Sequence, residues 1–416
     1  MYKRIAILIM TLAVIFASVS LAISSVDKNS YQELYRQVQL FADTLAIVQA
    51  DYVNEPKPKD LIYGALKGML VSLDPYSQFM DPDMFNELKV DTQGKFGGIG
   101  VEITIRDSLL TIITPIEDTP AWRAGLKSGD IIVKIKGELT RDLALTEAVK
   151  RMRGKPGEEI NLSILRESVK KILEFKIVRA IIKIKDIKEA KILKNGVAYI
   201  RLIEFRENTA ANMNSTLERL SKMGMKALIL DLRNNPGGLL ESSVKITSKF
   251  IPKGKLIVYT KGRKTTQDTE FISDVSNPLT TLPMVVLINE GSASGSEIVA
   301  GALQDYKRAT IIGTKSFGKG SIQTVIPLSD GSALRLTTSK YFTPLGKEIH
   351  EKGVTPDIIV EIETKTDRDQ KILEENGFKE QLFKEPAIFD YRSDTQVLRA
   401  LEILKIPELS QGSFAK

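Results

Sequence analysis

Three serines stand close together where an apolar run gives way to a stretch that reads as a helix. The run is "PMVVLIN", and the stretch is "GSASGSEIVAG", which contains Ser292, Ser294 and Ser296. Ser294 and Glu297 form the Ser-x-x-Glu pattern of a helix capping box, so Ser294 is expected either to cap the helix or to act as a nucleophile. A nucleophile there would lie among free N–H groups at the positive end of the helix dipole, where a developing oxyanion is stabilised. The pattern alone does not choose between the two roles.

A nucleophilic serine needs a base that takes its proton, so the presence of such a base distinguishes the nucleophile from the cap. The 416 residues include one histidine, His350, and no cysteine. His350 lies in the charged stretch "GKEIHEKG", and we expect it at the surface rather than in a Ser-His-Asp triad. The zinc pattern H-E-x-x-H and cysteine pairs are both absent, so neither a metal nor another cofactor is predicted. A lysine or a carboxylate remains as the base.

Lys319, in "GTKSFGKGS", is the leading candidate for this base. A neutral amine is a competent general base, and burial lowers the pKa of a lysine because it disfavours the cation. Gly318 and Gly320 permit the close approach that an inward-pointing lysine needs. Gln323 could orient the amine if the chain bends at Gly320. The stretch nearly spells a phosphate-binding P-loop, but Gly320 stands where that loop has Ser or Thr, so nucleotide binding is not expected.

From residue 181 onward, strand-like and helix-like segments alternate. The apolar runs "ALILDLR" and "PMVVLIN" follow the helix-like segments "TAANMNSTLERLSKMG" and "LLESSVKITSKFI", which predicts an α/β core with helices packed against a sheet. Asn195-Gly196 and Asp330-Gly331 each predict a tight hairpin turn. The N–H of Gly295 and that of a glycine in the loop "NNPGG", which follows the first run, could stabilise an oxyanion formed at Ser294.

Residues 96–167 read as a small α+β module. Short alternating strands such as "VEITI" and "IIVKIKG" surround two short helices, "TPAWRAGL" and "TEAVKRMRG". A glycine-rich turn at Gly97, Gly98 and Gly100 could point successive N–H groups into a concavity that holds a carboxylate. The strand from Val101 could then bind an extended peptide by backbone pairing. A plain tight turn is the alternative interpretation.

The N-terminus reads as an export signal. Lys3 and Arg4 precede an apolar run over residues 5–22, and a small-residue cleavage site ends at Ala22. The run, at about 18 residues, is also long enough to remain as a membrane anchor, so both outcomes stay open. Residues 31–90 then read as helical, because apolar residues recur at three- and four-residue spacing at Leu34, Val38, Phe41, Leu45 and Val48.

The charge of the chain argues against a nucleic-acid partner. The formal net charge is +7, and the lysines are spread along the chain rather than gathered in one segment. No segment interleaves aromatic with basic residues as a single-strand binder would. We therefore expect a solvated surface and no nucleic-acid groove.

These segments together resemble the carboxyl-terminal processing (tail-specific) serine proteases. The resemblance rests on six stretches in the order usual for that family: "LDPYSQFM", "FGGIGVEI", "AGLKSGDIIVKIKG", "LILDLRNNPGG", "GSASGSEIVAGALQDYKRATIIGTKSFGKGSIQT" and "TPLGKEIHEKGVTPD". It implies an α/β fold, with a crotonase-like Ser-Lys protease core, an inserted PDZ domain and helical N- and C-terminal segments. Carried over by position, the resemblance makes Ser294 the nucleophile, Lys319 the base and Gln323 its orienting partner.

The resemblance also implies binding groups and boundaries. The oxyanion hole would use the N–H groups of Gly238 and Gly295, the latter standing where the family often has alanine. Peptide binding would fall to Gly98, Ile99, Gly100 and Val101. The expected segments are a signal peptide or anchor (1–24), an N-terminal helical region (25–92), the PDZ domain (93–180), the protease core (181–365) and a C-terminal helical tail (366–416).

The predicted function is that of an exported serine endopeptidase that cleaves proteins near unstructured apolar C-terminal tails bound by its PDZ domain. We expect it in the periplasm or another extracytoplasmic space, anchored to the inner membrane if the N-terminal segment is kept. Protein substrates are the expected partners, and an activating adaptor protein or a homo-oligomer is compatible with the sequence. The alternatives are a non-catalytic PDZ adaptor on a protease-like scaffold and a small-ligand binder. Neither would need both Ser294 and Lys319, which are present.

Overall fold

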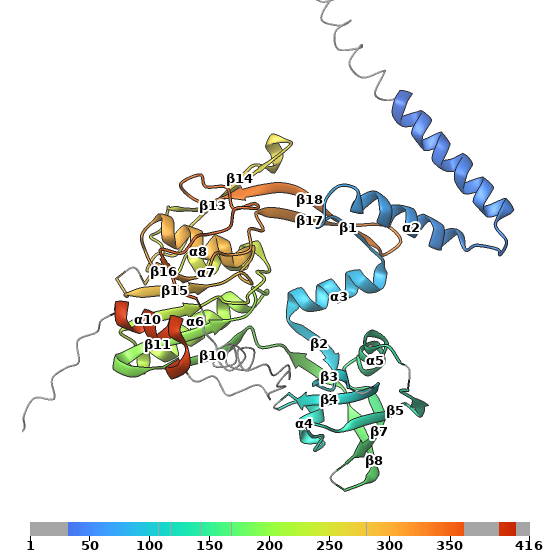
Figure 1. The fold of residues 1–416 in the computed structure, drawn as a ribbon, viewed down its shortest axis with the longest axis horizontal. Helices are drawn as coiled ribbons and strands as arrows, with labels where there is room; N and C mark the ends of the chain where they lie inside the picture. The colour runs from blue at the N-terminus through green and yellow to red at the C-terminus, as the bar shows by residue number, and fades with distance from the viewer. Residues whose placement is uncertain are drawn as a thin grey trace, which may run out of the picture. The chain divides into compact units, whose positions relative to one another are not determined.

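A computed structural model describes residues 32–361, apart from the single positions 107, 117, 142, 168 and 280, together with residues 391–404. These residues belong to two compact units (Figure 1). The smaller unit contains the residues up to Asp81 and Ile326–Leu336, and the larger contains Pro82–Val325 and the residues from Thr337 onward. The expected export segment (1–24) and most of the expected tail (366–416) lie outside the described residues. No helix within the described part of the chain is long and apolar enough to span a membrane.

The smaller unit combines helices with a short strand pair. Its elements are a helix over residues 32–51, α2 (Pro58–Val71), β1 (Gln78–Met80) and the first residues of β18 (Ala333–Phe342), with which β1 pairs antiparallel. The ring of Tyr63 contacts that of Phe79, and its hydroxyl donates to Asp330 Oδ2 at 2.7 Å. Hydrogen bonds from Ser332 and Tyr63 lower the pKa of Asp330 to about 2. Several apolar side chains of the first helix are exposed, among them Leu34, Val38 and Phe41.

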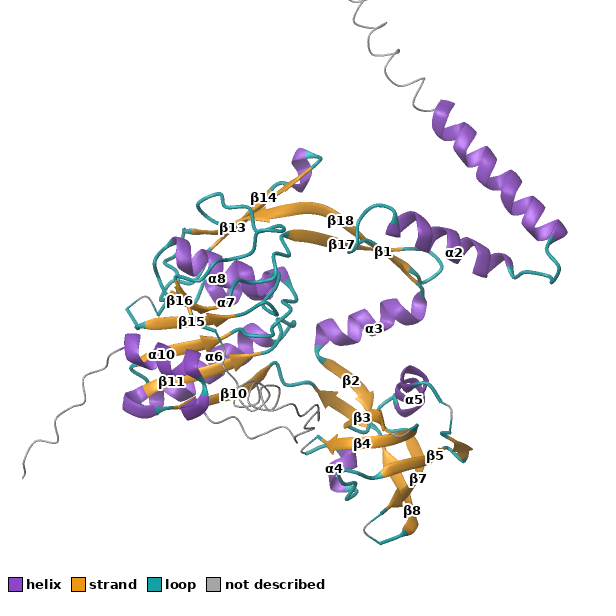
Figure 2. Ribbon diagram, in the orientation of Figure 1, coloured by secondary structure: helices purple, strands orange, loops and turns teal. Residues whose placement is uncertain are grey.

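The larger unit contains a small module built on one antiparallel sheet, drawn in orange with its two helices in purple in Figure 2. The strand order is β3-β4-β5-β7-β8, with β6 paired to β5, so β3 is an edge strand. The elements are β3 (Val101–Arg106), β4 (Leu109–Pro115), α4 (Pro120–Arg123), β5 (Ile131–Ile135), β6 (Glu138–Leu139), α5 (Leu145–Met152), β7 (Glu159–Arg166) and β8 (Lys171–Val178). Their apolar side chains form one core of their own.

A two-stranded antiparallel ribbon is formed by the segments that enter and leave this module. It changes the prediction made for the glycine-rich turn. β2 (Lys95–Gly98) pairs antiparallel with β9 (Ala180–Lys183). Gly97 and Gly98 were expected in the glycine-rich turn, but they belong to β2 because Ile181 and Ala180 pair with them. Only Ile99 and Gly100 are left between β2 and β3.

A six-stranded sheet forms the centre of the remainder of the larger unit. The strand order is β10-β11-β12-β15-β16-β19, in which β10 is antiparallel to β11 and the other pairs are parallel. The strands are β10 (Ile187–Ile192), β11 (Val197–Leu202), β12 (Ala227–Asp231), β15 (Met284–Ile288), β16 (Thr310–Gly313) and β19 (Ile358–Ile359). The predicted turn at Asn195-Gly196 joins β10 to β11, with Asn195 at φ 57° and ψ 24°. The second predicted hairpin, at Asp330-Gly331, joins β17 (Ser321–Pro327) to β18.

Helices cover both faces of this sheet, which explains why its central strands β12 and β15 are almost entirely apolar (Figure 1). Every residue of β12 and β15 is buried. Alternate side chains, such as Leu230 and Val286, pack with α6 (Thr209–Lys222), α7 (Leu240–Thr247) and α8 (Gly295–Asp305). The intervening ones, such as Ile229 and Leu287, pack with α10 (Thr395–Leu404). The predicted α/β core is confirmed.

The loops that matter for function all follow parallel strands. The chain leaves β11 toward Phe205, β12 toward "NNPGG", β15 toward Ser294 and β16 toward Lys319. The carboxyl ends of parallel strands lie at one edge of a sheet, and ligand sites of α/β folds form there. The topology therefore brings together segments as far apart in the chain as Phe205 and Lys319.

Asp231, the last residue of β12, is the centre of a buried polar network that fixes α10. Tyr199 donates to Asp231 Oδ2 at 2.7 Å, and the Arg233 guanidinium donates to both carboxylate oxygens at 2.9 and 2.6 Å. Arg233 also donates to Asp394 (3.1 Å), just before α10, and to Gln396 (3.0 Å) within it. The carboxylate of Asp231 is completely buried.

We expect Asp231→Ala to lower the free energy of unfolding by about 3–5 kcal/mol, because it leaves the Arg233 guanidinium buried without its nearer counter-charge. Arg399→Ala is the control, since Arg399 forms an exposed ion pair with Glu402 in α10. It should cost less than about 1 kcal/mol. Chemical denaturation followed by circular dichroism measures both losses. Equal small losses would contradict the role given to Asp231.

Candidate active site

The three clustered serines are in different environments. Ser292 and Ser296 are completely buried, and their hydroxyls donate to backbone carbonyls: Ser292 to Leu232 at 2.8 Å and Ser296 to Asn235 at 2.9 Å. Both bonds tie the serine loop to the loop after β12. Ser294, between them, is only half-buried. Ser294 is therefore the serine of the three that a substrate can approach.

The backbone of Ser294 does not have the conformation of an ordinary helix cap. It has φ 52° and ψ −111°, whereas an N-cap residue is normally extended. A non-glycine residue in such a sparsely populated region costs on the order of 1–3 kcal/mol and persists only where its surroundings enforce it. A comparable strained turn between strand and helix presents the nucleophile in α/β-hydrolases. Ser294 therefore forms the predicted capping box with Glu297 while its backbone has a conformation that a simple cap does not need.

Glu297, which the sequence suggested only as half of a capping box, is the centre of the site. Its side chain is completely buried in the first turn of α8. Oε2 accepts the N–H groups of Ser294 (2.8 Å) and Lys319 (2.9 Å). Oε1 accepts the N–H of Gly318 (2.7 Å) and the hydroxyl of Ser316 (2.6 Å). The two candidate catalytic residues are thus bound through their main chains to one oxygen atom.

Burial raises the pKa of Glu297, and the four donated hydrogen bonds oppose that rise because they stabilise the carboxylate. The capping-box pattern signals only the bond to Ser294. Sequence reasoning missed the bonds to residues 316–319, because those partners lie 19 to 22 positions further along the chain.

The loop "NNPGG" lies directly against Ser294. A Cβ atom on Gly237 would be 2.7 Å from Ser294 Cβ and 2.8 Å from the Gly295 nitrogen. Gly238 has φ 136°, and a Cβ there would be 2.1 Å from the Phe205 oxygen, so only glycine fits. Phe205 and Gly238 form a parallel bridge that uses the N–H groups of Phe205 and Leu239. The hydrogen bonds of the described residues give the N–H groups of Gly238 and Gly295 no protein acceptor.

Gln323 and His350 both lie close to the lysine loop. The Gln323 amide donates to the hydroxyls of Ser321 (3.0 Å) and Thr337 (3.4 Å). His350 was expected at the surface, but it is half-buried and its backbone packs against Gly320. Its Nδ1 atom is enclosed and has no hydrogen-bond partner. Close packing of the segment after β18 on the glycine-flanked lysine loop explains this difference.

In the small module, two carbonyls at the start of β3 are held by the segment around α4. The Ile99 carbonyl accepts the N–H of Ala121 at 2.8 Å, and the Gly100 carbonyl accepts the N–H of Ile116 and the hydroxyl of Thr119, both at 3.0 Å. The peptide bonds are trans, so the N–H groups of Gly100 and Val101 point away from these donors. α5 packs beside β3, which is an edge strand.

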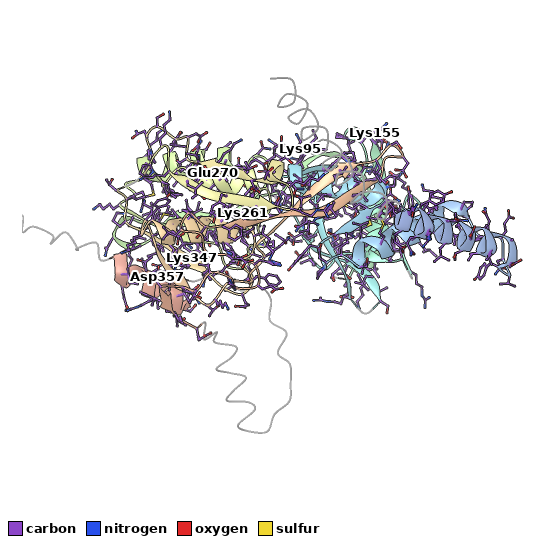
Figure 3. The ribbon with its side chains drawn as sticks, turned by 90° about the horizontal axis from the view of Figure 1, so that it is seen from above. Lys95, Lys155, Lys261, Glu270, Lys347 and Asp357 are labelled. Carbon is purple, nitrogen blue, oxygen red and sulfur yellow. The ribbon has the colours of Figure 1, made fainter. Side chains whose placement is uncertain are left out.

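A metal site or a pocket elsewhere in the larger unit would be a second candidate for a functional site. Within residues 32–361 and 391–404, no group of three or more His, Cys, Asp and Glu side chains is arranged to hold a metal ion. A pocket of about 1060 Å³ lies at the end of α8 opposite to Ser294, with Gln304 and Asp305 among its lining residues. Lys347 and Asp357, both labelled in Figure 3, line it from the segment after β18. None of the residues bonded to Glu297 lines this pocket.

Comparisons with known proteins identify the family of this chain. Three family models match the chain: peptidase family S41 over residues 196–360, the PDZ domain over 111–166 and the activating protease CtpB N-terminal domain over 11–84. The carboxy-terminal-processing protease of Bartonella bacilliformis is 46% identical over 353 residues, which cover 83% of this chain and 81% of that protein. This chain belongs to peptidase family S41. It is a serine-type, carboxy-terminal-processing peptidase with a PDZ domain.

Two further relatives extend the comparison of this S41 peptidase. The carboxyl-terminal-processing protease of Picosynechococcus is 36% identical over 367 residues, which cover 85% of this chain and 88% of that protein. The crystal structure of a Bacteroides fragilis protein assigned to the S41 proteases has a TM-score of 0.51 at 18% identity, and covers 85% of this chain and 91% of that one. At that identity, the second likeness supports the fold alone.

We expect Glu297→Gln to lower kcat by about 10²-fold, because the amide nitrogen that replaces one oxygen cannot accept the N–H groups it then faces. Each N–H left unsatisfied should also cost roughly 1–3 kcal/mol of stability. Glu290→Gln is the matched control, since Glu290 lies in the same loop and accepts only an exposed hydrogen bond from Thr314. Steady-state kinetics and thermal denaturation of both variants measure the effects. Wild-type kcat in Glu297→Gln would refute the role of the carboxylate.

The same carboxylate gives the wild type a distinctive pH dependence. Burial raises the pKa of Glu297, so this group takes up its proton at a higher pH than an exposed glutamate does. Activity should fall as the pH falls through that raised pKa. The protonated Glu297 carboxyl group accepts hydrogen bonds from the serine and lysine loops less well than the carboxylate does. Stability should change in the opposite sense. A carboxyl group whose pKa is higher in the folded state than in the unfolded state stabilises the fold at a pH below its unfolded-state pKa. That contribution is lost as the pH rises through its folded-state pKa. Parallel losses of activity and stability on acidification would contradict this assignment.

Proposed function

We propose that this S41 peptidase is a Ser-Lys endopeptidase in which Ser294 is the nucleophile, Lys319 is the general base and Gln323 orients the lysine. The observation that carries the proposal is the single Glu297 oxygen that accepts the main-chain N–H groups of both Ser294 and Lys319. It keeps the serine at the start of α8 and the lysine loop together at the carboxyl edge of the sheet. Both residues are half-buried, so they remain within reach of a substrate.

In the acylation step, the Ser294 oxygen attacks the scissile carbonyl while its proton passes to the neutral Lys319 amine. The carbonyl oxygen becomes an oxyanion, which the N–H groups of Gly238 and Gly295 stabilise. These donors are suited to the task because they have no protein acceptor to release. When the intermediate collapses, the C–N bond breaks and the leaving amine takes the proton from Lys319.

In the deacylation step, water attacks the acyl-enzyme ester and gives its proton to Lys319. The ester C–O bond then breaks, and the proton returns to the Ser294 oxygen, which restores the starting state. Lys319 must be neutral at the start of each step.

We further propose that the PDZ domain binds the C-terminal tail of a protein substrate at Gly98, Ile99, Gly100 and Val101. The N–H groups of Gly100 and Val101, which point away from the segment around α4, would hold the terminal carboxylate. The tail would pair with β3, an edge strand with α5 beside it. An unstructured apolar tail suits this mode, because a strand must be extended before it can pair.

We propose a crotonase-like core over residues 181–365, a PDZ domain over 93–180, an N-terminal helical region over 25–92 and a helical tail over 366–416. Residues 1–24 would direct export to the periplasm or another extracytoplasmic space and be either cleaved or kept as an anchor. An activating adaptor protein or a homo-oligomer would control access to the site. The exposed apolar side chains of the helix over 32–51 support a role for that helix in assembly.

The Ser-Lys assignment predicts that Ser294→Ala and Lys319→Ala each lower kcat/KM by roughly 10⁴–10⁶-fold, because each removes a group that the chemical step requires. Cleavage of an unfolded protein with an apolar C-terminal tail is the assay, and circular dichroism verifies folding. Ser215→Ala and Lys222→Ala, on the exposed face of α6, are the matched controls and should be fully active. His350→Asn should retain kcat/KM within about tenfold. Its complete inactivation would point to a histidine base instead.

The tail-binding assignment predicts that amidation of the substrate C-terminus raises KM by about 10–100-fold and leaves kcat nearly unchanged. The change removes the charge from a carboxylate whose hydrogen bonds are worth roughly 1.5–3 kcal/mol. Acetylation of the substrate N-terminus is the control and should have no effect. Identical KM values for the free and amidated tails would rule out recognition of the carboxylate.

A further inference from the structure

Tyr341, near the end of β18, lies between the serine loop and the lysine loop. Its side chain is 1% exposed, and its hydroxyl lies 3.1 Å from the Ser294 carbonyl oxygen and also contacts the Lys319 carbonyl oxygen. A phenol has one proton to donate, so the two carbonyls share it. Burial raises the pKa of Tyr341, so the hydroxyl keeps that proton at neutral pH.

The Ser294 and Lys319 carbonyls differ in their other contacts. The Ser294 carbonyl also accepts the N–H groups of Glu297 (2.9 Å) and Ile298 (3.0 Å), which belong to the first turn of α8. It is therefore a fixed point of the helix. The Lys319 carbonyl belongs to a loop with glycine on both sides, whose main chain would have more freedom without the contacts that hold it.

The main chain of Tyr341 also holds the lysine loop, because its N–H donates to the Gly320 carbonyl at 2.9 Å. The residue thus binds two successive carbonyls of the loop, one through its main chain and one through its side chain. Glu297 binds the N–H groups of Ser294 and Lys319, and Tyr341 binds their carbonyls. Both polar groups of each main-chain unit are therefore fixed.

We propose that Tyr341 is a positioning residue that ties the lysine loop to the rigid start of α8 and so sets the place of Lys319 relative to Ser294. This inference rests on the proposed Ser-Lys function. Tyr341 acts through the two carbonyls and not on the substrate, because its buried ring and hydroxyl have no free surface to offer. The strained backbone of Ser294 makes such enclosure necessary, since a strained residue persists only where several contacts define it.

The test is Tyr341→Phe, which removes one oxygen atom. We expect kcat to fall by about 10²-fold, as for other small misplacements of a catalytic group, and KM to change less than about twofold. The split between kcat and KM separates the positioning of a reacting group from a change in substrate binding. A purely structural role would leave kcat per folded molecule unchanged.

Two further variants separate positioning from packing. Tyr306→Phe is the matched control, because Tyr306 also donates to a backbone carbonyl, that of Leu256, at 2.8 Å. It should retain the wild-type kcat. The second variant places 4-aminophenylalanine at position 341, which restores an N–H donor in the same shape and should recover most of kcat. This variant also keeps the test valid if Tyr341→Phe does not fold.

The outcomes distinguish this inference from the proposed function. Wild-type kcat in Tyr341→Phe, with Ser294→Ala inactive in the same assay, would overturn the positioning role and leave the Ser-Lys mechanism intact. An inactive but folded 4-aminophenylalanine variant would also overturn it. Activity in Ser294→Ala would refute the proposed function itself.

Discussion

The buried carboxylate of Glu297 is the constraint on which the rest of the site depends. A charge without exposure to water is costly unless several hydrogen bonds compensate it, and four donors surround this one. Three of these donors belong to residues 316–319, which reach α8 only when the chain beyond β16 has folded back. A fold with the lysine loop elsewhere would leave the carboxylate without most of its partners. Assembly of the site is therefore coupled to folding of the core.

The sheet provides the second requirement, which is a place where several loops can meet closely. The loops after β11, β12, β15 and β16 all leave the same edge, and they crowd one another there. Gly237 and Gly238 lie where a side chain would collide with Ser294 or with the main chain of Phe205. Asn235, completely buried, joins three of these loops: its amide donates to Leu202, and its carbonyl accepts from Ala293 and Ser296. The strained Ser294 is stable because such contacts surround it.

The sequence predicts those features that local pattern determines. The alternation of apolar runs and amphipathic segments gave the α/β core, and Asn195-Gly196 marked a turn whose dihedral angles only a few residue types adopt. Contacts between distant segments left no such pattern. The Tyr341 hydroxyl reaches Ser294 from 47 positions away, and nothing in the spacing signals this. Gly97 and Gly98 were assigned to a turn because glycines suit turns, but pairing with β9, over 80 residues later, decided their place. His350 was misplaced for the same reason, since its contact with Gly320 is tertiary.

A lysine base raises a difficulty that a histidine base does not. In a Ser-His-Asp triad, a carboxylate holds the imidazole directly, whereas a lysine carries its amine on a flexible four-carbon chain. In this protein Glu297 binds the main-chain N–H of Lys319, and Tyr341 binds its carbonyl. Fixing the main chain limits the volume that the amine can sample, and the half-buried environment limits it further. Gln323, the proposed orienting residue, is itself held by hydrogen bonds to Ser321 and Thr337. Under the proposed mechanism, this main-chain restraint adds to the orienting role proposed for the Gln323 side chain.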